Sequence, residues 1–78
     1  MPEYPRTLIK SGTTTITAES SYVDVTHSIG TVPEWVDPQP TNVYAIWYYL
    51  SNIGATTFRI NLQVAQASDA TFRWSSGI

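Results

Sequence analysis

The chain has 78 residues, which allow one small domain, and a domain of this size buries only about two-thirds of the surface that its unfolded chain exposes. It has no cysteine and a single histidine, so we expect neither disulfides nor a metal to stabilise it, and partner subunits to supply further buried surface. Four basic and six acidic residues give a net charge of −2 with no cluster of either sign, which speaks against a nucleic-acid surface.

Residues 1–10 are expected to form an extended arm and the start of the first strand, because Pro2 and Pro5 disfavour both helix and ladder pairing. Residues 11–78 are then expected to form one β-sandwich domain. The start of the chain lacks the apolar core of a signal peptide, and no run approaches the roughly twenty apolar residues of a membrane span. We therefore expect a protein that is made in a cytoplasm and has no membrane contact.

The run at residues 7–18 is rich in β-branched residues, which favours a strand, and Gly12 is expected to mark a bulge or bend in it. A second strand follows in YVDVTHSIG, where Val23 and Val25 have the inward parity. The outward residues of that strand are Tyr22, Asp24 and Thr26.

A turn at Gly30 and Pro33 leads to a short third strand that begins at Trp35 and is closed by DPQP. The two prolines of DPQP cannot donate to a ladder, which favours an edge position for this strand.

The run NVYAIWYYL at residues 42–50 does not alternate, because both of its faces are apolar or aromatic. Its β-forming residues, without a period of 3.6, favour a strand over a helix. It is either a central strand covered by a loop or a second subunit, or an exposed aromatic platform for a ligand. We expect a subunit contact, since large apolar patches usually mark interfaces between copies of one chain. The expected contact residues are Tyr44, Ile46, Trp47, Tyr48 and Tyr49.

The last third of the chain alternates with period two over two successive runs, which is typical of half-buried antiparallel strands. Between NVYAIWYYL and the first of these runs a turn is expected at SNIGATT, where Asn52 and Gly54 tolerate positive φ. The inward residues of the two runs are Phe58, Ile60, Leu62, Val64, Ala70, Phe72 and Trp74. The chain is therefore predicted to be all-β, a small six-stranded antiparallel β-sandwich or partly closed barrel.

The order of three segments resembles a known family. VDVTHSIGTVPEWVDPQPTN, YYLSNIGATTFRINL and SDATFRW are similar to the small domains of phage tail, tail-fibre and baseplate proteins, over residues 11–74. The resemblance implies an H-type lectin-like sandwich that assembles as a homotrimer, and animal and slime-mould lectins of that plan bind N-acetylgalactosamine between subunits. It also implies a location in a virion, with other virion proteins and possible host-surface glycans as partners.

Sugar recognition needs an aromatic face and planar polar groups around it. The aromatic candidates are Trp47, Tyr48 and Tyr49, and the polar candidates are Asp24, Asn42, Arg59 and Asp69. Packing and subunit contact are the alternative for the aromatic residues, and we favour it. For Arg59, cross-strand pairing on a solvated face is favoured in the same way.

His27 is the only imidazole, and it ends the second strand with the inward parity. We expect it to hydrogen-bond the backbone of the following turn, as the resemblance implies for this position, and not to bind a metal. No nucleophile, base and carboxylate are marked as a triad, so we expect no enzyme and no cofactor.

These features favour a structural or adhesion component of a phage-like particle. Its loops at residues 20–22, 36–42 and 64–70 would touch a host glycan or a neighbouring virion protein. The alternatives are a self-standing carbohydrate-binding lectin and a purely architectural decoration protein without a ligand.

Overall fold

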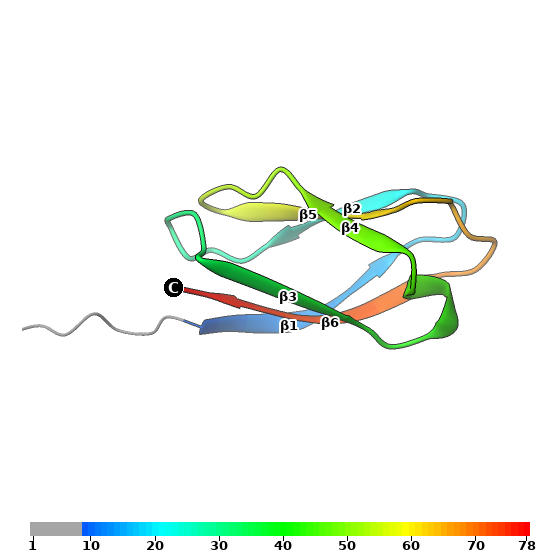
Figure 1. The fold of residues 1–78 in the computed structure, drawn as a ribbon, viewed down its shortest axis with the longest axis horizontal. Coiled ribbons are helices and arrows are strands. Elements are labelled where there is room, and N and C mark those ends of the chain that lie inside the picture. Colours follow the sequence, from blue (N-terminus) through cyan, green and yellow to red (C-terminus); the bar gives the residue numbers. More distant parts are fainter. Residues whose placement is uncertain (1–8) are drawn as a thin grey trace, which may run out of the picture.

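The computed structural model describes residues 9–78, which form six strands and a short 3₁₀ helix. Figure 1 shows two layers of strands facing each other. One layer is the antiparallel sheet β1-β6-β3 and the other is the antiparallel sheet β2-β5-β4, so the expected all-β architecture with six antiparallel strands is confirmed. In chain order the elements are β1 (Ile9–Ile16), β2 (Tyr22–Thr26), β3 (Trp35–Pro40), η1 (Val43–Ala45), β4 (Tyr48–Ser51), β5 (Thr57–Leu62) and β6 (Ala70–Gly77).

The core lies between the layers and is built mainly from the two central strands, β5 and β6. Their alternate side chains point inward, as the period of two predicts. The ring of Phe58 meets that of Trp74 edge to face at 5.4 Å between centroids, which joins the two sheets. The buried residues of these strands include Phe58, Ile60, Leu62, Ala70, Phe72 and Trp74.

The predicted parity also holds in β2 and fails at the end of β5. Val25 is buried and Val23 is half-buried against the core, while Tyr22, Asp24 and Thr26 face solvent. Val64 was expected inside but is exposed, because β5 ends at Leu62 and the chain bends at the next two residues. A residue with the inward parity therefore reaches the core only if the strand extends to its position.

The edge position expected for β3 is confirmed, because β3 pairs only with β6 within its sheet. The backbone N–H of Thr41 donates to the carbonyl of Thr71 at 2.9 Å, one step beyond the last paired residues of β3. Hydrogen-bonded pairs alternate along an antiparallel ladder, so Pro38 and Pro40 fall at positions whose nitrogen points away from β6. The prolines therefore cost β3 no ladder bond.

The bulge expected at Gly12 is wrong. β1 pairs with β6 without interruption from Ile9 opposite Gly77 to Ile16 opposite Ala70. Gly12 is needed there for packing, because a Cβ at this position would lie 3.2 Å from Nε1 of Trp74.

The single strand expected at residues 42–50 is also wrong. Asn42 caps the 3₁₀ helix η1 through a hydrogen bond from Tyr44 N to its Oδ1 at 3.2 Å, and β4 begins only at Tyr48. β4 is moreover an edge strand, since β5 is the centre of its sheet. A side-chain cap thus overrides the β propensity of this run.

Turn and arm expectations have mixed outcomes. Asn52 has a φ of 50° in the turn between β4 and β5, so of the two residues that tolerate positive φ there, Asn52 adopts it and Gly54 does not. The first strand begins at Ile9, within the segment expected to be its start, and the rest of the predicted arm at residues 1–8 lies outside the described residues.

Candidate functional site

The outer face of the sheet β2-β5-β4 brings polar and aromatic side chains together in two cross-strand rows. In the first row Asn61 of β5 lies opposite Tyr22 of β2 and Tyr49 of β4. In the second row Arg59 lies opposite Asp24 and Ser51. We name this surface the tyrosine face, made of Tyr22, Asp24, Tyr49, Ser51, Arg59 and Asn61.

Arg59 is held in place by two neighbours on β2. Its Nε donates to Oδ1 of Asp24 at 2.7 Å and its Nη2 to Oδ2 at 3.3 Å, and its guanidinium lies 4.3 Å from the ring centroid of Tyr22. The hydrogen bond from Arg59 lowers the pKa of the Asp24 carboxyl below its ordinary value and raises the pKa of the guanidinium. Both groups therefore stay charged at neutral pH, and the pair orients the guanidinium along the face.

Asn61 is held in place by two residues of β4, Ser51 and Tyr49. Its Nδ2 donates to Oγ of Ser51 at 2.8 Å and to the carbonyl of Tyr49 at 3.3 Å. These bonds use the amide donors and leave Oδ1 as an acceptor on a half-buried residue. The two flanking rings stay accessible, since Tyr22 is 49% and Tyr49 51% exposed.

Of the seven sugar-site candidates, the structure places Asp24, Arg59 and Tyr49 on the tyrosine face. Trp47 lies just before β4, and its carbonyl accepts a hydrogen bond from Gln63 N at 3.0 Å, which continues the β4-β5 pairing by one step. That step gives Trp47 the same parity as Tyr49, and its side chain is 68% exposed. Trp47 therefore extends the aromatic surface at the β4 border.

The other three candidates are engaged in contacts within the fold. Asn42 caps η1 and also donates from Nδ2 to the carbonyl of Asp69 at 2.9 Å. The carboxylate of Asp69 accepts from the N–H of Ala18 at 2.8 Å. Tyr48 points into the sandwich, where its ring meets that of Phe72 edge to face at 5.5 Å. The structure does not bring these three residues onto the tyrosine face.

Tyr22 and Asn61 belong to the face but were not among the sequence candidates. Alternation placed Tyr22 on the outward side of its strand, and it does the same for Asn61, which lies between the inward Ile60 and Leu62. Only the register, which sets Tyr22 opposite Asn61 and Tyr49, shows that they form one row. A sequence without pairing information does not contain that register.

A second, apolar surface surrounds η1 and meets the tyrosine face at Trp47. Ala45 is buried beneath it and fixes the turn against the core, while the flanking side chains face solvent. Val43 is 70% exposed and Ile46 56%, and Tyr44 is partly covered. We name residues 43–47 the η1 surface. Of the contact residues expected from the sequence it holds Tyr44, Ile46 and Trp47.

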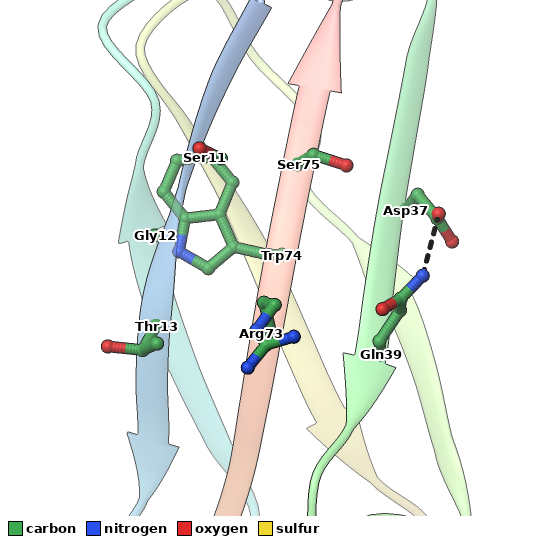
Figure 2. Close-up of a pocket in the computed structure, with 8 residues that line it drawn as sticks. All are labelled: Ser11, Gly12, Thr13, Asp37, Gln39, Arg73, Trp74 and Ser75. Atoms are coloured by element: carbon green, nitrogen blue, oxygen red, sulfur yellow. Dashed lines mark hydrogen bonds between the residues drawn. The ribbon is translucent and has the colours of Figure 1, made fainter.

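The outer face of the other sheet, β1-β6-β3, carries a shallow groove of about 260 Å³. Figure 2 shows Arg73 of β6 between Thr13 of β1 and Gln39 of β3. Nε2 of Gln39 lies 3.5 Å from Oδ2 of Asp37, the dashed line in the figure. The one aromatic residue of this groove, Trp74, is buried, so the groove offers hydroxyls and charge without an exposed ring.

The structural role expected for His27 is confirmed. The backbone N–H of Ile29 donates to Nδ1 at 3.0 Å, so Nε2 carries the ring proton and donates it to the carbonyl of Gly54 at 2.8 Å. The ring is buried and stacks on Phe58 at 6.1 Å between centroids. His27 thus ties the turn after β2 to the turn before β5.

Within residues 9–78 no three histidine, cysteine, aspartate or glutamate side chains are grouped so that they could hold a metal ion. None of the helical structure in the described part of the chain is long and apolar enough to cross a membrane. Comparison with protein families, with curated proteins and with solved structures finds no match for this chain.

Proposed function

We propose that this protein is a structural and adhesion module of a phage-like particle, which assembles with copies of itself and presents the tyrosine face to a host-surface glycan. The observation that carries the adhesion part is the row Tyr22, Asn61 and Tyr49, with Arg59 beside it. The likeness of three sequence segments to phage tail domains supports the virion location and the homotrimer. The H-type lectin-like plan belongs to the same proposal.

The chemistry of the tyrosine face fits a sugar better than a charged or purely apolar ligand. Two exposed rings lie two strand spacings apart, about 10 Å, with the amide oxygen of Asn61 between them and the guanidinium of Arg59 over the ring of Tyr22. A pyranose ring can lie on one phenol while its hydroxyls bond the amide and the guanidinium. Because Asp24 neutralises Arg59, the face carries little net charge, which favours a neutral sugar over an anion.

Assembly is assigned to the η1 surface in this proposal. Its side chains other than that of Ala45 are apolar or aromatic and exposed, and they lie beside the tyrosine face at Trp47. A subunit seated there would cover apolar area that a lone 78-residue domain leaves in water. Repetition of the tyrosine face in a trimer would let weak single-site sugar contacts add up through multivalency.

A glycan array probed with the purified, fluorescently labelled protein tests the adhesion part. We expect binding to neutral sugars, lost in Tyr49→Ala and Asn61→Ala and kept in Gln39→Ala, which changes the outer face of the opposite sheet. An intact oligomer that binds no glycan would favour an architectural decoration protein instead. Glycan binding by a protein whose gene lies apart from tail, baseplate or capsid genes would favour a self-standing lectin.

A further inference from the structure

The four edge strands of the two sheets are protected to very different degrees. β3 carries Pro38 and Pro40, whose nitrogens face outward and offer no donor. β4 has only four residues, and the hydroxyl of Tyr48 on it bonds the carbonyl of Pro38 at 3.1 Å. β2 has five residues and carries the charge of Asp24.

β1 is the least protected of the four. It has eight residues and no proline, and the charge of Lys10 near its start is the only one of these features that it carries. Within the described part of the chain β1 pairs with β6 alone, so its other edge has no strand beside it. Long edges without such protection are the positions at which sheets accept another strand.

The ladder shows which backbone groups face that open edge. The bond from Thr41 N to the carbonyl of Thr71 means that odd-numbered residues of β6 bond β3, so its even-numbered residues bond β1. Their partners in β1 are the even-numbered residues from Lys10 to Ile16. The N–H and C=O groups that point outward therefore belong to Ile9, Ser11, Thr13 and Thr15.

We propose that this open edge of β1 binds the same edge of a second copy of the chain, in an antiparallel pair with Gly12 on the two-fold axis. In that register the outward backbone groups of Ser11 meet those of the partner's Thr13, and those of Ile9 meet those of the partner's Thr15. All four outward-facing residues of each strand are then paired. The β1-β6-β3 sheets of the two copies then form one continuous sheet of six strands.

The side chains of β1 are compatible with this register. The pair on the axis is the close, non-hydrogen-bonded kind, and Gly12 has no side chain to clash there. Ser11 and the partner's Thr13 place hydroxyls side by side on the outer face, a favourable cross-strand pair. Lys10 lies opposite the partner's Thr14, so no like charges face each other.

Residues 1–8 are a poor alternative occupant of the edge. A strand that pairs with β1 must present an N–H at every second residue. Pro2 and Pro5 have opposite parity, so one of them would interrupt the bonded positions in either alignment. β1 of a second copy has no such interruption.

Amide hydrogen exchange followed by NMR at two protein concentrations tests this contact in the full chain. The amides of Ser11, Thr13 and Thr15 should be protected at high concentration and exchange freely on dilution, while those of Gly12 and Thr14 stay protected throughout by β6. Free exchange of the three amides at every concentration overturns the proposal. Protection that does not change with dilution also overturns it, since the partner would then lie within the same chain.

Substitutions at Thr13 supply the matched variants. Thr13→Pro removes one outward N–H and should raise the dissociation constant of the contact at least about tenfold, whereas Thr13→Val keeps the N–H and should not. If Thr13→Pro fails to fold, Thr13→Asp serves in its place, because it sets two like charges about 7–8 Å apart across the axis. Added salt should restore part of the association that Thr13→Asp loses, because salt screens the repulsion between the two carboxylates. The proposal is overturned if Thr13→Pro, or Thr13→Asp where the proline variant does not fold, associates as tightly as the wild type.

The contact at β1 is independent of the proposed function. Trp47→Ala should weaken assembly through the η1 surface and leave the concentration-dependent protection of the β1 amides unchanged. Loss of that protection in Trp47→Ala would show that the β1 contact does not form by itself, and would overturn it.

Discussion

The phenol of Tyr48 donates a hydrogen bond of 3.1 Å to the carbonyl of Pro38, which links edge strand β4 of one sheet to edge strand β3 of the other. The same ring meets Phe72 edge to face. Tyr48 thus closes one side of the sandwich, whereas its neighbour Tyr49 faces solvent on the tyrosine face. Adjacent tyrosines on one strand have opposite roles because successive side chains point to opposite faces of a sheet.

Two replacements of Tyr48 should distinguish the contribution of its hydrogen bond from that of its ring contact. Tyr48→Phe removes only the hydrogen bond to Pro38 and should lower the free energy of unfolding by about 1 kcal/mol. Tyr48→Ala also removes the contact with Phe72 and should cost several times more. Urea unfolding of the two variants measures the difference. Equal losses would mean that the ring contact contributes little.

Core and surface substitutions in β6 should differ strongly. Phe72→Ala and Trp74→Ala remove buried rings and should each cost roughly 3–5 kcal/mol, which is enough to unfold a domain of this size. Arg73→Ala, between them on the exposed face, should change stability by less than about 0.5 kcal/mol. Thermal melts followed by circular dichroism test the contrast, and similar melting temperatures would contradict the assigned parity.

His27 should be sensitive to loss of either ring nitrogen. His27→Asn keeps an acceptor near Nδ1 for the Ile29 N–H but leaves the carbonyl of Gly54 without its donor, and His27→Gln does the reverse. Each should cost about 1–3 kcal/mol, the penalty for a polar group left unpaired in a buried place. His27→Ala loses both bonds and should cost more than either. If His27→Ala is as stable as the wild type, the two hydrogen bonds of this ring do not stabilise the fold.

The pair of Asp24 and Arg59 predicts a small, acid-sensitive contribution to stability. Because Arg59 lowers the pKa of Asp24 in the folded state, the contribution is fully present above the ordinary carboxyl value of 3.8 and is lost as the pH falls through the lowered pKa. Asp24→Asn should therefore melt slightly below the wild type at neutral pH and at the same temperature at a pH below that lowered value. The difference should be small, because the pair is solvent-exposed. A difference in melting temperature that does not change with pH would mean that the charge of Asp24 is not its cause.

The parts of the fold that follow from local alternation could be predicted, and those that depend on pairing between distant segments could not. Alternation placed Phe58 and Trp74 inside without any knowledge of their partners. The 3₁₀ turn was missed although Asn42, a good cap, stands directly before the apolar run. Once Asn42 starts that turn, the strand begins six residues later, and only then does the inward position of Tyr48 follow.

Gly12 shows a second limit of the same kind. A glycine within a run of threonines indicates either a bulge or a close approach of another group. The choice depends on Trp74, which lies 62 positions later in the chain and covers Gly12 through the register of β1 with β6. The tyrosine face has the same origin, since its members come from three strands. Registers of this kind are long-range information that spacing along one strand does not carry.

Trp47→Ala separates the η1 surface from the tyrosine face as the place of assembly. A side chain that is 68% exposed adds little to the stability of a lone domain, so its removal should matter only if a second subunit covers it. We expect Trp47→Ala to reduce the oligomer seen by light scattering after size exclusion, and to lower the melting temperature further on dilution, because folding and association are linked by mass action. Tyr49→Ala should keep the oligomer and lose glycan binding. An oligomer left intact by Trp47→Ala and by Ile46→Ala would exclude the η1 surface as the subunit contact.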